Sequence, residues 1–415
     1  MKWKEWNLNL KIRLIGESLY GLFYWMLLPF MAIYFSDSFG KEMAGYLLIA
    51  SQFLSVLATL FGGYLADTYG RKRMMVISTF VQSFAFILFT FANSSILESP
   101  LLTFIAFSLL GIMGSLYYPA SAAMVSDTVQ EDKQSNVFAV FYTAININVV
   151  AGPIIGAYFF FTHRFELLLV STIVNVMLAF VFQIFIRETL PIHTGVDNKS
   201  WITVLKEQVS NYKVIFQDRI FFIFILSGIF IAQTYTQIDL LLAVYIKEII
   251  HGQVFFHFFI TGESLFSWII AENGLLVALF TVAVTKLSNR FSEKTIFILS
   301  SILYGISMLV FDNVPSVIGM IVAMAIFTLG EIVVVGIQNS FVSKIAPENM
   351  RAQYFATSML RWSIGRTVAP IAIPVSQWLG YSLTFILIAI LALVSACLYW
   401  IMFTVMEKEK TSCQM

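Results

Sequence analysis

The chain of 415 residues is 59% hydrophobic, and only 12% of its residues are charged. A soluble domain would carry about twice that charged fraction, so the composition excludes a soluble globular protein. The net charge of +1 indicates no preference for nucleic acid or for acidic partners. The mean hydropathy of +0.83 instead indicates an integral membrane protein.

Apolar stretches of membrane-spanning length recur from one end of the chain to the other. A helix needs about 20 apolar residues to cross the hydrocarbon core of a bilayer. Such stretches lie near 13–36, 43–66, 74–93, 99–124, 137–161, 165–186, 220–246, 267–288, 295–311, 315–342, 352–379 and 382–405. The sequence therefore predicts an all-α integral membrane protein with twelve transmembrane helices.

The longest polar segment, 188–219, separates the sixth and seventh predicted spans. We expect it to be a cytoplasmic linker between two pseudo-symmetric six-helix bundles, formed by residues 1–187 and 220–415. A faint internal repeat supports two related halves, because residues 287–294 echo residues 65–72. Parallel repeats of this kind occur in transporters.

Cationic residues are distributed unevenly between the predicted loops. With the N-terminus inside, 20 of the 25 Lys and Arg residues fall in cytoplasmic segments and three fall in outer loops. Cytoplasmic loops of membrane proteins carry such an excess of Lys and Arg. The bias predicts a multi-pass protein of a bacterial cell membrane with both termini in the cytoplasm.

A short charged turn, residues 63–73, joins the second and third predicted spans. We expect Gly63 to allow close helix approach and Gly70 to adopt a positive φ angle. Asp67, at a helix end, can pair with Arg71 or face the positive end of another helix. The turn is too short for a soluble domain, so its charges are expected to act at the membrane surface.

A proline within the fifth span lies between two glycines. Pro153 removes a backbone donor and is expected to kink the helix. Gly152 and Gly156 are expected to let a neighbouring helix pack closely.

The charged turn resembles the signature loop of the major facilitator superfamily, with Thr68 in place of a common arginine. The proline motif resembles the helix-five motif of the antiporter branch of that superfamily. The acids Asp127, Asp239 and Glu331 match positions in multidrug exporters typified by the lactococcal secondary multidrug transporter. The resemblance implies the major facilitator fold and drug:proton antiport. The gating residues that it and the motifs imply are Gly63, Asp67, Gly70, Arg71, Lys72, Asp127, Gly152, Pro153 and Gly156.

Three acids within spans are candidates for proton and substrate binding. A charged side chain inside a bilayer costs roughly 2.5–3.5 kcal/mol on insertion scales, so it seldom occurs without a partner or a function. Glu331 and Arg361 are predicted at similar depth, and Arg361 is the expected ion-pair partner. Glu331 could have a static structural role in this ion pair, or it could bind protons and cations in turn. Glu272 either lines the same cavity or is an acid near a helix N-terminus.

Span seven carries a polar stripe beside Asp239. Tyr235 lies four residues away on the same helix face, where its ring can contact a bound cation. We expect proton coupling at Glu331 and Asp239. The predicted substrate-binding set is Asp239, Glu331, Tyr235, Gln233 and Glu272.

The sequence contains no phosphate-binding glycine loop of the ATPase type and no hydrolase motif, so we expect no enzyme activity, cofactor or metal site. The predicted function is secondary active efflux of lipophilic or cationic compounds in exchange for protons, by alternating access. The expected partners are protons, these substrates and the lipid bilayer, with no nucleic acid and a monomeric state. Two alternatives remain: a proton-coupled importer of peptides or small metabolites, and a non-transporting membrane sensor or scaffold with the same fold.

Overall fold

The structure is a computed structural model that describes residues 3–189, 218–255, 258–288, 290–346, 354 and 357–413. Most of the predicted linker lies outside these described residues. The chain divides into two compact units. The first contains Met1–Gly40 and Leu47–Ser200, and the second contains Lys41–Tyr46 and Trp201–Met415.

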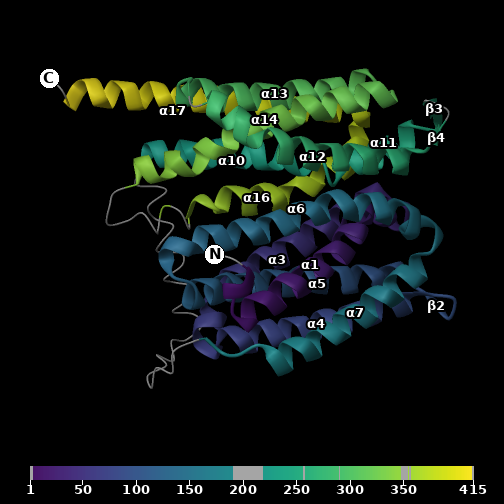
Figure 1. The fold of residues 1–415 in the computed structure, drawn as a ribbon. Helices are drawn as coiled ribbons and strands as arrows, with labels where there is room; N and C mark the ends of the chain where they lie inside the picture. Colours follow the sequence, from purple (N-terminus) through teal and green to yellow (C-terminus); the bar gives the residue numbers. More distant parts are fainter. Residues whose placement is uncertain are drawn as a thin grey trace. The chain divides into compact units, whose positions relative to one another are not determined.

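In the first unit, the described elements are long helices and one short hairpin (Figure 1). They are α1 (Leu8–Leu27), α2 (Met31–Phe39), α3 (Lys41–Tyr69), α4 (Arg71–Ala92), β1 (Asn93–Ser94), β2 (Leu97–Glu98), α5 (Pro100–Thr128), α6 (Glu131–Thr162) and α7 (Arg164–Phe185). The first residues of α3, Lys41–Tyr46, belong to the second unit. The two strands pair antiparallel, with Asn93 opposite Glu98. Helix α4 packs against α5 and α7, while α1 packs against α6 and α7.

Local sequence signals set the helix boundaries of this unit. The Asn7 side chain accepts a hydrogen bond from the Leu10 N–H at 2.9 Å and so caps the start of α1. Ser99 caps α5 in the same way, accepting from the Leu102 N–H at 3.3 Å. Gly70 separates α3 from α4 with a φ angle of 102°. Glycine adopts this angle readily, so two long helices meet across a single residue.

The described part of the second unit is also mainly helical (Figure 1). Its elements are α10 (Arg219–Thr236), α11 (Leu241–Ile249), β3 (Gln253–Phe255), β4 (Phe258–Ile260), α12 (Gly262–Ser288), α13 (Glu293–Asn313), α14 (Val317–Ile345), α16 (Leu360–Val368) and α17 (Ala372–Cys413). The strands form an antiparallel hairpin with Gln253 opposite Ile260. Helix α10 packs against α16 and α17, α13 against α14 and α17, and α12 against α14.

Aromatic side chains fill the core of the second unit between α10, α13 and α14. Phe224, Phe297 and Phe341 are each at most 1% exposed. The Phe341 ring centroid lies 5.3 Å from that of Phe224 and 5.3 Å from that of Phe297. These contacts pack α10, α13 and α14 against one another near the start of α10.

Eleven helical segments in the described part of the chain are long and apolar enough to cross a membrane. The last, Leu360–Lys408, contains 49 residues, which is more than twice the length that one span requires. Its backbone leaves helical geometry at Gly380, where φ is 80° and ψ is 165°. This segment therefore accounts for two of the twelve predicted spans, and the predicted all-α multi-pass fold is confirmed.

Candidate substrate and proton site

Span seven is broken in the middle, next to Asp239. Helix α10 ends at Thr236 and α11 begins at Leu241, and the Asp239 N–H donates to the Thr236 carbonyl at 3.2 Å. The fully buried Gln237 stabilises this break, because its Nε2 donates to the Gln233 carbonyl and the Ala369 carbonyl, each at 3.1 Å. Broken helices of this kind place backbone carbonyls and side chains around ion sites in transporters.

Glu331, in the middle of α14, is held by neutral donors. Asn273 Nδ2 donates to Glu331 Oε2 at 3.0 Å, and the Tyr235 hydroxyl donates to Glu331 Oε1 at 3.4 Å. Asn273 is positioned in turn by a 3.0 Å bond to Thr328 Oγ1. Within the described part of the chain, Glu331 has no ion-pair partner, and the nearby Asp239 carboxylate repels its charge. The carboxylate therefore has hydrogen bonds but no built-in counter-charge.

A cavity of about 330 Å³ opens beside Glu331. Its lining combines one acid and one arginine with an amide, three aromatic rings and apolar side chains. The lining residues are Ile231, Tyr235, Tyr304, Glu331, Val334, Val335, Gln338, Met359, Trp362 and Arg366. The Tyr235 ring meets Trp362 edge to face, with centroids 5.4 Å apart. All of the lining residues that the structure describes belong to the second unit.

The predicted ion pair between Arg361 and Glu331 is absent from the structure. Arg361 Nη2 instead donates to Gln338 Oε1 at 3.0 Å, and the guanidinium lies 4.8 Å from the centre of the Phe224 ring. The methylenes of Arg361 pack over Gly228, where a Cβ atom would come within 2.5 Å of Arg361 Cδ. The space above this glycine directs the arginine to Gln338 rather than to the acid.

The other predicted site residues lie around the cavity or away from it. Tyr235 and Glu331 line it, whereas Gln233, Asp239 and Glu272 are not among its lining residues. Asp239 lies close enough to Arg366 for their charges to interact. Glu272 Oε2 is buried and has no hydrogen-bond partner in the described part of the chain. Roles for these three residues therefore stay predictions.

Asn273, Gln338 and Arg366 are site residues that the sequence did not single out as binding groups. Asn273 and Gln338 are polar side chains within apolar helices, which is a signal that the sequence carries, whereas Arg366 lies in the more polar helix α16. Asn273 directly follows Glu272, the acid that the sequence pattern indicates as a candidate. Among the described residues, no group of three or more His, Cys, Asp or Glu side chains could hold a metal ion.

The charged turn of the first unit is held together by Arg71. Its Nη1 lies 2.9 Å from Asp67 Oδ1, and its Nε lies 3.0 Å from Asp127 Oδ2. Glu188 accepts bonds from the backbone N–H groups of Arg71 and Lys72, at 2.9 and 3.1 Å. A carboxylate at a helix N-terminus is favourable, so the start of α4 is fixed by three acids. The gating role of this network stays a prediction.

Close helix packing is predicted at Gly63 and at the pair Gly152 and Gly156, and the structure shows it only at the pair. A Cβ atom at Gly63 would meet nothing within 4 Å, so close helix approach is not found there. It is found at Gly62, where a Cβ would lie 3.1 Å from the Ser115 carbonyl of α5, because neighbouring residues face different sides of a helix. At Gly152 and Gly156, added Cβ atoms would collide with Trp25 and Met26, so α6 packs closely there as expected.

Helix α6 continues through Pro153 without leaving helical geometry, and Pro153 lies inside the span Glu131–Thr162. The gating role of Pro153 stays a prediction.

The intramembrane acid of the first unit, Glu17, has a built-in cation. Arg13 Nε lies 3.0 Å from Glu17 Oε1, which also accepts bonds from the Tyr117 and Ser121 hydroxyls at 2.8 Å each. The Arg13 guanidinium also donates to Ser121 and lies 5.0 Å from the Phe141 ring centre. Helices α1, α5 and α6 thus meet around a neutralised pair.

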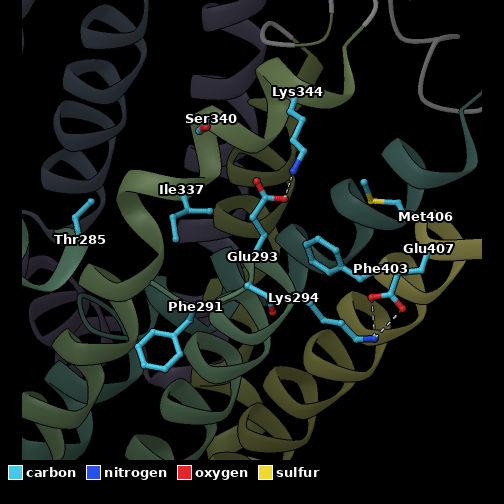
Figure 2. A pocket seen from close by; sticks show the side chains of 11 residues that line it. Thr285, Phe291, Glu293, Lys294, Ile337, Ser340, Lys344, Phe403, Met406 and Glu407 are labelled. Atoms are coloured by element: carbon cyan, nitrogen blue, oxygen red, sulfur yellow. Dashed lines mark hydrogen bonds and ion pairs between the residues drawn. The ribbon is translucent and has the colours of Figure 1, made fainter. Parts of the chain in front are cut away.

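The second unit has charged pairs at the start of α13 (Figure 2). Lys344, near the end of α14, lies 2.9 Å from Glu293, the first residue of α13. Lys294 Nζ lies 3.4 Å from Glu407. Arg71 and Asp127 occupy the same helix positions in the first unit, at the start of α4 and near the end of α5, with the opposite order of charge. The faint sequence repeat therefore corresponds to a repeated, charge-reversed contact.

Helical units of membrane-spanning length, with an acid within a span that lines a small cavity, define a multi-pass membrane protein of the secondary-transporter class. The chain belongs to the major facilitator superfamily, whose family model matches residues 14–370 and 256–413. The predicted membership is thereby confirmed.

Similar proteins narrow the class. A Na(+), Li(+), K(+)/H(+) antiporter of Planococcus maritimus is 48% identical, over 99% of both chains. A multi-drug resistance efflux pump of Streptococcus pneumoniae is 24% identical, over 98% of both chains. These relatives support the drug:proton antiporter branch. A solved POT family transporter in complex with 5-aminolevulinic acid shares the fold, with a TM-score of 0.78, 16% identity, and coverage of 94% of this chain and 95% of that one.

Proposed function

We propose that this protein exchanges protons for monovalent metal cations by alternating access, with Glu331 as the group that binds either ion. The observation that carries the proposal is the Glu331 carboxylate, which is held by Asn273 and Tyr235 and lacks a built-in cation in the described part of the chain. The relative that is 48% identical, a Na(+), Li(+), K(+)/H(+) antiporter, supports the choice of ions.

Competition at one carboxylate explains the coupling. An isolated negative charge is costly inside a membrane, so Glu331 is stable when it carries a proton or when a cation lies against it. The two ions exclude each other because each neutralises the same group. Asp239 adds negative charge near the site, and the positive charge of Arg366 partly offsets it. The Tyr235 hydroxyl donates to the Glu331 carboxylate, and Tyr304 lines the same cavity.

The remaining predicted residues act around this exchange. The network of Asp67, Arg71 and Asp127 closes the cytoplasmic side when the transporter faces outward. Close packing at Gly152 and Gly156 keeps α6 against α1 while the units change orientation. Both termini lie in the cytoplasm of a bacterial cell in this proposal.

Proteoliposomes test the proposal directly. Vesicles with an acidic interior and a trapped pH dye receive external Na⁺, Li⁺ or K⁺, with choline as the control cation. Wild-type protein should raise the internal pH with the metal ions and not with choline. Glu331→Gln should abolish this response, while Glu166→Gln, which alters an exposed acid at the start of α7, should preserve it. Full exchange by Glu331→Gln would contradict the proposal.

A second candidate function is the export of lipophilic cations. The aromatic walls of the cavity, formed by Tyr235, Tyr304 and Trp362, favour it because aromatic faces attract organic cations. Tetraphenylphosphonium should then raise the Na⁺ concentration required for proton exchange. An unchanged Na⁺ requirement would exclude this cavity as the binding site of lipophilic cations.

The same vesicles test the two alternative functions. Entry of a solute together with protons would favour a proton-coupled importer, and the absence of all flux would favour a membrane sensor.

A further inference from the structure

We infer that the cavity beside Glu331 also recognises small aromatic zwitterions, with the ammonium group at Glu331 and the carboxylate at Arg366. The inference rests on the proposed function only in using the same cavity. Its basis is that one acid and one arginine line the cavity from α14 and α16 without pairing with each other.

Arg366 supplies the anion-binding side of the cavity. In the described part of the chain, its guanidinium forms no ion pair and donates no hydrogen bond, although its charge acts on Asp239. A guanidinium presents a planar set of donors that matches a carboxylate with two parallel hydrogen bonds. A metal cation at Glu331 leaves this exposed guanidinium without a bound anion, whereas a zwitterion neutralises both charges.

Gln338 extends the donor side of the same cavity. Arg361 can only donate hydrogen bonds, so the side-chain atom of Gln338 that it contacts at 3.0 Å is the oxygen. The amide NH₂ of Gln338 is then left for other acceptors. Gln338 follows Glu331 by seven residues on α14, two turns or roughly 10 Å along the helix axis. The lining of the cavity therefore contains an acceptor, Glu331, and two groups that can donate, Arg366 and the Gln338 amide.

The walls and the volume select an aromatic body of modest size. Tyr235, Tyr304 and Trp362 contribute aromatic rings to the lining that also contains the two charged groups. The volume of about 330 Å³ lies at the lower end of the range for ligand pockets, roughly 300–1,000 Å³. A single aromatic amino acid is of the size that such a cavity accepts.

Three probes with the same ring separate the contributions of the charges. Purified wild-type protein is titrated with L-phenylalanine, which carries both charges, with phenethylamine, which is only a cation, and with 3-phenylpropionate, which is only an anion. Charged hydrogen bonds are strong enough that L-phenylalanine should bind roughly tenfold more tightly than either singly charged probe. Equal binding of L-phenylalanine and phenethylamine would overturn the inference.

Variants of Arg366 assign the anion-binding group. Arg366→Gln should weaken L-phenylalanine binding about tenfold and leave phenethylamine binding unchanged, which also shows that the cavity is intact. Arg366→Lys, which retains the charge, should lie between this variant and the wild type. Arg219→Gln, an exposed arginine at the start of α10, is the matched control and should bind like the wild type. Undiminished L-phenylalanine binding by Arg366→Gln would overturn the inference.

The two sets of experiments can contradict the zwitterion site without contradicting the proposed metal-ion exchange, and the reverse. Na⁺-driven proton exchange that depends on Glu331, together with no preference for L-phenylalanine, would remove the zwitterion site and leave the antiporter. Tight binding of L-phenylalanine that depends on Arg366, without Na⁺-driven exchange, would support the site and remove the metal-ion exchange.

Discussion

The two units treat their intramembrane acids differently. Glu17 in the first unit lies 3.0 Å from Arg13, whereas Glu331 in the second is held by the amide of Asn273 and the hydroxyl of Tyr235. The first acid carries its counter-charge permanently. The second acid lacks one among the described residues, which is why we propose that exchangeable ions balance its charge. The difference agrees with a structural role for the first acid and with the exchange role proposed for the second.

The largest effect should come from giving Glu331 a permanent cation. Asn273→Lys places an ammonium group where the amide now donates to the carboxylate at 3.0 Å. The second unit would then resemble the first, and Na⁺-driven proton exchange in proteoliposomes should fall to background. Asn146→Lys, on α6 in the first unit, is the control substitution. Normal exchange by Asn273→Lys would show that Glu331 is not the exchange site.

Removing the charge of Glu17 in the first unit should affect the stability of the protein rather than Na⁺-driven proton exchange. Arg13 is only 2% exposed, so Glu17→Gln leaves a buried cation without its partner. The expected loss is on the order of 3 kcal/mol, seen as a lower thermal unfolding midpoint in detergent. Protein that remains folded should still exchange Na⁺ for protons. A folded Glu17→Gln variant without exchange would move ion coupling into the first unit.

A smaller effect is expected at the charged turns that begin α4 and α13. Asp127→Asn removes a carboxylate from the partly buried network of Arg71 and should destabilise the protein by about 1–3 kcal/mol. Lys344→Gln removes the ion-pair partner of Glu293. Because the Lys344 side chain is 52% exposed, the loss of stability should be under about 1 kcal/mol. Thermal unfolding of both variants measures the difference. Equal losses would show that the two turns are equivalent despite their different burial.

Much of the fold follows from local patterns in the sequence. The apolar stretches give the spans, and the charged turn predicts the meeting of Asp67 with Arg71, because residues four apart share a helix face. The twelfth span also follows from length, although the helix that contains it begins well before Gly380. Periodicity and capping are properties of neighbouring residues, so one chain is enough to detect them.

The contacts of the site depend on helix rotation and on packing between distant residues. Asn273 and Glu331 are 58 residues apart, and their bond requires α12 and α14 to turn particular faces toward each other. Similar depth in the membrane suggested Arg361 as the partner of Glu331, but Gly228 creates the space that leads Arg361 to Gln338. Depth along a span can be counted from the sequence, whereas the direction of a side chain is set by its neighbours.

Proton release from purified protein tests the central claim most directly. Na⁺ added to wild-type protein in weakly buffered detergent solution should displace protons from Glu331. More Na⁺ should be needed as the pH falls, because protons compete for the same carboxylate. Glu331→Gln should release no protons, while Glu166→Gln should behave like the wild type. Equal release by Glu331→Gln, or a Na⁺ requirement that does not change with pH, would contradict the account.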